Sequence, residues 1–103
     1  MLATDSLHRQ LGRTLDARRS ALAEAIVACE TGRHPELEQR YGPTLREKSR
    51  EDAGYHLQFL AAAIRTETPA LFCDYVAWMN VLLVKRGILA EDIAFHLACL
   101  QEV

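Results

Sequence analysis

The sequence has 103 residues, half of them apolar and a quarter charged, with only five Gly and three Pro. This length excludes a second enzyme-sized domain, because single cores usually serve chains of about 100 to 200 residues. Twelve basic and fourteen acidic residues give a formal charge of -2, which argues against a protein whose main task is to hold a nucleic-acid backbone. We expect residues 1–103 to form one compact domain that does not bind nucleic acid.

The composition favours an all-α fold. Ala and Leu each occur 15 times, whereas Val and Ile together occur nine times, and Ala and Leu lose less side-chain freedom in a helix. The sequence has no apolar run of about 18 residues, and it places His8 and Arg9 where a secretory signal needs an apolar core. We therefore expect a cytoplasmic protein that does not contact membranes.

The three cysteines, Cys29, Cys73 and Cys99, are odd in number, far apart and without a C-x-x-C pair. This spacing indicates neither a disulfide framework nor a zinc site. We interpret them as small, mostly buried thiols in a reducing compartment.

The first predicted helix covers residues 6–30, because Leu and Ile recur there at steps of four and seven, and Thr31 and Gly32 supply a stop. Arg18 and Arg19 interrupt its apolar stripe. We interpret this interruption as a turn of helix that faces solvent, and the alternative is an arginine that meets a carboxylate across the fold.

A short helical segment is predicted over residues 35–41. The two helices after it are each marked by a residue pattern typical of a helix start. Thr44 and Glu47 have the spacing of a capping box, in which the two side chains satisfy free backbone N–H groups, so a third helix should run from there to about residue 65. Thr68 followed by Pro69 predicts an N-cap and a first-turn proline for the fourth helix.

The fourth helix should end at Lys85, Arg86 and Gly87, where cations precede a permissive glycine, and the last helix should cover residues 89–103. Links of about two to four residues require neighbouring helices to run antiparallel. The predicted fold is an antiparallel helical bundle of four main helices plus a short connecting helix. The helices differ in length, which would leave part of a long helix uncovered, so we expect a homodimer to bury the remaining stripe.

Asp52 and His56 lie four residues apart and therefore share a face of the third helix. A carboxylate beside an imidazole can fix its tautomer for ligand binding or raise its pKa. The alternative is a histidine at the edge of the core that its neighbour satisfies and that binds nothing. His96 could approach from the last helix, but the inward Glu-x-x-His pairs of di-iron bundles are absent, so we expect no metal site.

Tyr75, Trp78 and Met79 form an aromatic cluster on the fourth helix that could line a flat cofactor such as a tetrapyrrole. The alternative is ordinary core packing, which also places aromatic residues at helical spacing. The sequence contains no nucleophile elbow and no glycine-rich phosphate loop. We therefore expect no enzymatic activity.

Several segments together resemble a known family. They are Arg40-Tyr41-Gly42, Asp52-x-x-Tyr55-His56-Leu57-x-Phe59-Leu60-x-x-Ala63, Pro69-x-Leu71-Phe72-x-Asp74-Tyr75-Val76-x-Trp78 and Arg86-Gly87-Ile88. Over residues 38–100 the chain resembles the helical N-terminal module of bacterial cobalamin-binding-domain regulatory proteins. It is more remotely similar to the cofactor-free, globin-like sensory modules of stress-signalling proteins.

The resemblance implies a regulatory or sensory module that acts with a partner protein or a C-terminal domain. Its family marks in this sequence are Asp52, Tyr55, His56, Asp74, Tyr75 and Trp78, and all of them except Asp74 are the five candidate binding residues. No D-x-H-x-x-G cobalamin motif is present, so the resemblance does not carry cobalamin binding over. The function expected is a non-catalytic module that acts through protein–protein interaction. The alternative is a sensor that binds a tetrapyrrole or corrin through these same five residues.

Overall fold

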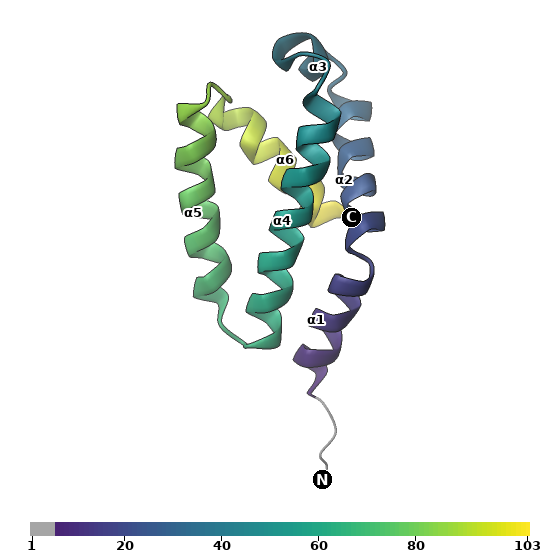
Figure 1. Cartoon of the computed structure of the whole chain (residues 1–103), viewed down its shortest axis with the longest axis vertical. Helices are drawn as coiled ribbons and strands as arrows, with labels where there is room; N and C mark the ends of the chain where they lie inside the picture. Colours follow the sequence, from purple (N-terminus) through teal and green to yellow (C-terminus); the bar gives the residue numbers. More distant parts are fainter. Residues whose placement is uncertain (1–5) are drawn as a thin grey trace.

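The computed structural model describes residues 6–103, so residues 1–5 of the predicted domain lie outside the described residues. The described chain is all-helical, as the composition predicted (Figure 1). Its helices are α1 (Leu7–Ala17), α2 (Arg19–Arg33), α3 (Glu36–Tyr41), α4 (Leu45–Arg65), α5 (Pro69–Lys85) and α6 (Ala90–Glu102). Within residues 6–103, none of these helices is both long and apolar enough to cross a membrane.

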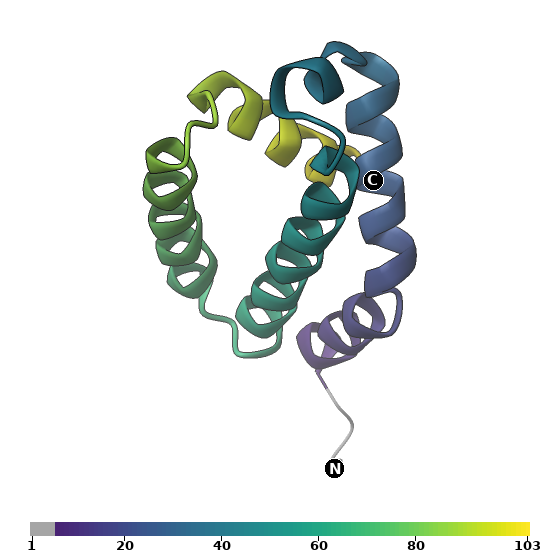
Figure 2. The ribbon, with the colours of Figure 1, turned by 45° about the horizontal axis from the view of Figure 1, so that its top comes forward.

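Helix α4 is the centre of the fold. It packs against α1 and α2 on one side and against α5 on the other (Figure 1). Helix α6 crosses from the end of α5 back to α2, which Figure 2 shows from above. The molecule is thin and elongated, with extents of 55 × 25 × 18 Å. Helix α5 lies at its outer edge (Figure 1).

The predicted continuous helix over residues 6–30 was wrong, because the chain breaks at Arg18. The backbone of Arg18, with φ -103° and ψ 10°, leaves the helical conformation and separates α1 from α2. The Arg18 side chain is exposed. The break lets α1 follow the last turns of α4, where Gly12 is buried against the carbonyl of Ala61. An ion pair between Arg65 and Asp16 joins α4 to α1 beside this contact.

The other helices begin and end within a few residues of the predicted positions. The threonine side chains that were predicted to stop or cap them do not do so. Thr31 does not stop α2: it is buried, and its hydroxyl donates to the Val27 carbonyl at 2.8 Å. The Thr44 side chain makes no capping hydrogen bond, because its φ of -89° and ψ of 1° differ from the extended backbone of an N-cap. The Thr68 hydroxyl donates to the Thr66 carbonyl at 3.0 Å and does not cap α5.

The predicted end of the fourth helix at Lys85, Arg86 and Gly87 is confirmed by the end of α5 at Lys85. Gly87 has a φ of 93°, which favours glycine, and the Ile88 N–H donates to the Leu83 carbonyl at 3.0 Å. This pattern closes the helix with a left-handed residue. The turn leads the chain into α6, which runs from the end of α5 to α2 (Figure 2).

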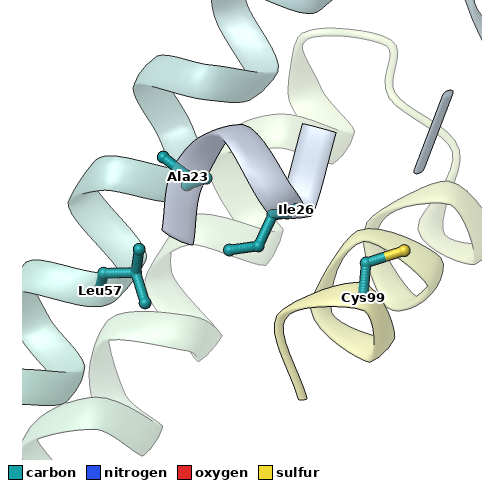
Figure 3. Packing of buried hydrophobic residues seen from close by; sticks show 5 residues of the cluster. Ala23, Ile26, Leu57 and Cys99 are labelled. Carbon is teal, nitrogen blue, oxygen red and sulfur yellow. The ribbon is translucent and has the colours of Figure 1, made fainter. Parts of the chain in front are cut away.

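Two apolar clusters form the core. The first lies between α2, α4 and α6 and contains Ala23, Ile26, Ala53, Leu57 and Cys99 (Figure 3). The second lies between α5 and α6 and contains Tyr75, Met79 and Ile93. Helix α6 contributes to both clusters, so its buried side separates them.

Candidate functional site

Four polar side chains are buried where the two clusters meet. Glu30 comes from α2, Ser49 and His56 come from α4, and His96 comes from α6, and each is at most 8% exposed. Buried polar groups are costly unless they are hydrogen-bonded. Their partners therefore determine what this part of the molecule can do.

Glu30 organises one half of this polar group. One carboxylate oxygen lies 2.8 Å from Nδ1 of His96, and the other accepts a hydrogen bond from the Ser49 hydroxyl. Burial alone would raise the pKa of Glu30, but the contacts with His96 and Ser49 outweigh it and hold the pKa below its ordinary value. An ionised carboxylate can only accept, so Nδ1 of His96 donates and carries a proton.

His56 organises the other half. Its Nδ1 lies 2.7 Å from the Tyr75 hydroxyl, which reaches across from α5. The Tyr75 ring is in turn stacked on Phe59, with centroids 4.1 Å apart. Burial, followed by the charge of His96, lowers the pKa of His56 to about 3, and burial raises the pKa of Tyr75 to about 12. Both groups are therefore neutral near pH 7.

The expected hydrogen bond between Asp52 and His56 does not form. Nδ1 of His56 is engaged by Tyr75, and Nε2 of His56 has no hydrogen-bond partner. The two residues share a face of α4 as predicted, but the longer tyrosine from α5 reaches the ring instead. Asp52 is half-buried beside the histidine, and burial raises the pKa of its carboxyl group.

Both buried histidines leave one nitrogen without a partner. Nε2 of His56 and Nε2 of His96 make no hydrogen bond within the described residues. The two rings lie edge to face, with centroids 5.0 Å apart. Both residues line a cavity of about 470 Å³, together with Glu30, Asp52, Met79 and Arg86. The cavity wall therefore combines two histidines with charged groups of both signs and apolar side chains.

The remaining predicted site residues lie outside the cavity. Tyr55 is 50% exposed and Trp78 is 62% exposed, and neither lines the cavity wall. Tyr75 is buried and touches the site through His56. Tyr75 and Trp78 are tilted, with centroids 6.3 Å apart. The structure thus brings Asp52, His56 and Tyr75 together and leaves Tyr55 and Trp78 on the surface.

Glu30 and Ser49 were missed by the sequence interpretation, although a signal existed. Glu30 follows Ala23, Ile26 and Val27 at helical spacing, so it stands where the α2 stripe requires a buried residue. A carboxylate at such a position needs a partner from another helix. Within residues 6–103, no three His, Cys, Asp or Glu side chains are placed to hold a metal ion.

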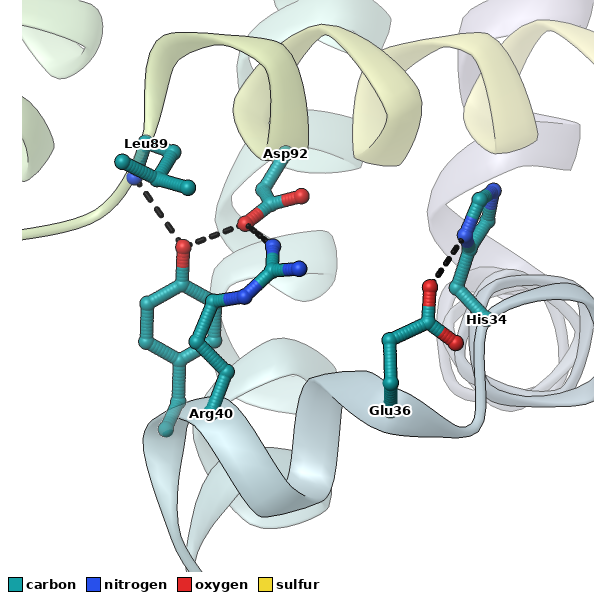
Figure 4. Close-up of polar contacts among 6 residues, drawn as sticks. His34, Glu36, Arg40, Leu89 and Asp92 are labelled. Atoms are coloured by element: carbon teal, nitrogen blue, oxygen red, sulfur yellow. Dashed lines mark hydrogen bonds and ion pairs between the residues drawn. The ribbon is translucent and has the colours of Figure 1, made fainter.

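A second polar cluster closes the same cavity near α3 (Figure 4). Asp92 accepts hydrogen bonds from the Tyr41 hydroxyl and from Arg40, and the Leu89 N–H donates to the Tyr41 oxygen at 3.0 Å. Leu89 is the N-cap of α6 and supplies no side-chain cap. Tyr41 therefore caps α6 from α3 and fixes where that helix begins.

Comparison of the sequence with family models and curated proteins, and of the fold with solved structures, gives no match. The site must therefore be interpreted from its own residues.

Proposed function

We propose that this chain is a non-catalytic regulatory module that acts through protein–protein interaction and pairs with a second copy of itself through α5. The observation that carries the proposal is the outer face of α5, which we define as Leu71, Asp74, Trp78, Val81, Val84 and Lys85. All six residues are exposed and lie along one face of α5, next to the stripe that carries the buried Tyr75 and Met79.

The outer face of α5 is unusually apolar for a surface. Trp78 is 62% exposed, Val81 is 54% exposed and Val84 is 47% exposed. A helix that is apolar on all sides is normally covered on all sides, but the helices that pack closely on α5 within the described chain are α4 and α6. A contiguous exposed apolar face of this kind marks an interaction surface.

The charges on this face favour a second copy as the occupant. Asp74 precedes Trp78 by four residues, and Lys85 follows Val81 by four. In an antiparallel symmetric pair that places Trp78 over Val81 of the second copy, Asp74 therefore falls opposite Lys85 of the second copy. Neither charge has an ion-pair partner within residues 6–103, so both are available for this contact. A self-complementary face is what a two-fold interface requires.

The second copy would cover the outer face of α5, as the predicted homodimer requires. The antiparallel bundle of four main helices within one chain is also part of this proposal. The relationship to the helical modules of cobalamin-binding regulators, the action on a partner protein and the cytoplasmic location belong to the same proposal.

Light scattering at micromolar concentration tests the pairing, and we expect the mass of a dimer. Trp78→Ala should raise the dimer Kd by about 30-fold or more, as for a buried aromatic interface anchor. Asp74→Lys and Lys85→Asp should each weaken the dimer, because each creates two like-charge contacts, and the double variant should restore it. Gln39→Lys, on the surface of α3, is the control and should change nothing. A monomeric parent protein, or a double variant no better than the single ones, would contradict the proposal.

A second candidate function is a small-molecule sensor, and the unpartnered Nε2 atoms of His56 and His96 favour it. Their cavity of about 470 Å³ falls within the roughly 300 to 1,000 Å³ of known ligand pockets. If a tetrapyrrole or corrin were bound, an imidazole nitrogen would hold its metal. Because Tyr55 and Trp78 lie outside this cavity, the binding residues would be His56 and Asp52, with Tyr75 orienting the histidine.

Absorption spectroscopy tests this second function. Added haem or cobalamin should shift its spectrum on binding, and His56→Ala should abolish the shift while His34→Ala, on the surface, preserves it. An unchanged spectrum with both cofactors would remove this candidate.

A further inference from the structure

Cys29 on α2 and Cys99 on α6 face each other although they are 70 residues apart in the sequence. Their Sγ atoms are 2.8 Å apart, closer than two non-bonded sulfur atoms normally approach. A disulfide bond is about 2.05 Å long, so its formation requires the two atoms to close by less than about 1 Å. Figure 3 shows Cys99 in the first core cluster, on the side of α6 that packs toward α2.

No sequence pattern indicates this pair, because the spacing of the cysteines matches no known motif. The third cysteine, Cys73, is exposed on α5 and has no contact with the other two. The fold therefore divides the three thiols into a close pair and a separate one.

We propose that Cys29 and Cys99 are a reversible thiol–disulfide site, which a small-molecule disulfide such as oxidised glutathione converts to an intramolecular disulfide that clamps α6 to α2. The site does not involve the outer face of α5, so it stands or falls separately from the proposed dimer.

The two cysteines have different roles because their surroundings differ. Cys29 is half-buried and accessible, and its Sγ also lies 3.8 Å from a carboxylate oxygen of Glu102. Glu102 is paired with Arg33, whose guanidinium offsets the negative charge beside the thiol. Cys99 is fully buried, and burial, with the contact to Cys29, raises its pKa to about 12. Cys29 is therefore the attacking thiol and Cys99 the resolving one.

The reaction is a thiol–disulfide exchange in two steps. The Cys29 thiolate attacks one sulfur of oxidised glutathione, forms a mixed disulfide and releases one glutathione thiolate. The Cys99 sulfur then attacks the Cys29 sulfur, and the second glutathione leaves as a thiolate that takes up the Cys99 proton. Two protein thiols are oxidised, one small disulfide is reduced, and two molecules of glutathione are formed.

The disulfide would act directly on the buried polar cluster. Cys29 precedes Glu30, and Cys99 lies one helical turn after His96, so the new bond would form beside the contact between these two residues. It would also close a long loop, which restricts the unfolded chain. We expect the melting temperature to rise by about 10 °C or more, as for a disulfide that closes a long loop in a domain of this size.

The test uses the reduced full-length protein incubated with oxidised glutathione. In Cys73→Ser, which lacks the exposed thiol, we expect the number of free thiols to fall from two to none and the mass to fall by two hydrogen atoms. Peptide mapping should find a Cys29–Cys99 link in this variant and in the parent protein. Cys99→Ser should stop at a glutathione adduct on Cys29, whereas Cys29→Ser should take up no glutathione at Cys99.

Two results would overturn the proposal. One is a parent protein that keeps three free thiols while a control peptide disulfide forms in the same buffer. The other is a link that involves Cys73. Trp78→Ala should form the Cys29–Cys99 link normally, which separates this test from that of the dimer.

Discussion

Nδ1 of His96 donates to the Glu30 carboxylate at 2.8 Å, although the two residues are 66 positions apart in the sequence. The Ser49 hydroxyl occupies the other carboxylate oxygen, so one acidic side chain connects α2, α4 and α6. The carboxylate also fixes the orientation of the imidazole and directs Nε2 away from itself. The orientation of the His96 ring is thus set by a contact that lies deep in the core.

Removal of the Glu30 charge should destabilise the fold. Glu30→Gln preserves the shape but loses the charge that holds His96 and Ser49, and we expect the free energy of unfolding to fall by about 1.5 to 3 kcal/mol. Urea unfolding measures the change. Glu24→Gln is the control on the same helix, because Glu24 forms an exposed ion pair with Arg50 that is worth at most about 1 kcal/mol. Equal losses in the two variants would show that burial of Glu30 adds nothing.

The low pKa of His56 predicts that stability decreases in mild acid. The folded protein takes up this proton only near pH 3, whereas the unfolded chain takes it up below about pH 6.5. The contribution of His56 is therefore fully present above pH 6.5 and is lost as the pH falls toward 3. The slope should approach about 1.4 kcal/mol per pH unit. Glu30 has a lowered pKa and acts in the same direction, but only below its ordinary value of 4.5.

Denaturant unfolding between pH 6.5 and 4.5 tests this prediction. His56→Gln preserves a hydrogen-bonding side chain for Tyr75 but cannot titrate there, so the decline should become shallower. Gln58→Ala, at an exposed position of the same helix, should leave the slope as it is in the parent protein. A parent protein of constant stability across this window would show that His56 titrates normally.

The sequence predicted most helix positions because those depend on local signals. The turn at Gly87 and the proline that opens α5 act within a few residues. The break at Arg18 was missed because it reflects how α1 packs on α4, where Gly12 meets Ala61. The partner of His56 was also missed. Asp52 and Tyr75 were both plausible from their positions, and the geometry between α4 and α5 decides which one reaches the ring.

Two glycines within helices should respond in opposite directions to the same substitution. A Cβ at Gly12 would meet Cγ of Arg65 at 2.1 Å and the Ala61 carbonyl at 3.0 Å, whereas a Cβ at Gly54 would meet nothing within 4 Å. Gly12→Ala should therefore lower stability by about 1 to 3 kcal/mol through overpacking. Gly54→Ala should raise it by about 0.5 to 1 kcal/mol, because alanine restricts the unfolded chain. Thermal unfolding of the two variants measures the loss of stability in one and the gain in the other. A stabilising Gly12→Ala would exclude the close approach of α1 to α4.

The Tyr41 hydroxyl should control the first turn of α6. It donates to Asp92 and accepts from the Leu89 N–H, so Tyr41→Phe leaves a backbone donor and a carboxylate without this partner. We expect a loss of about 1 to 2 kcal/mol in the free energy of unfolding. Hydrogen exchange should also become faster at the start of α6, while α4 is unchanged, because local opening needs only the contacts that tie that turn. Tyr55→Phe, which removes an exposed hydroxyl from α4, should affect neither measurement. Unchanged exchange in α6 would mean that Arg40 and Asp92 hold the helix start without the tyrosine.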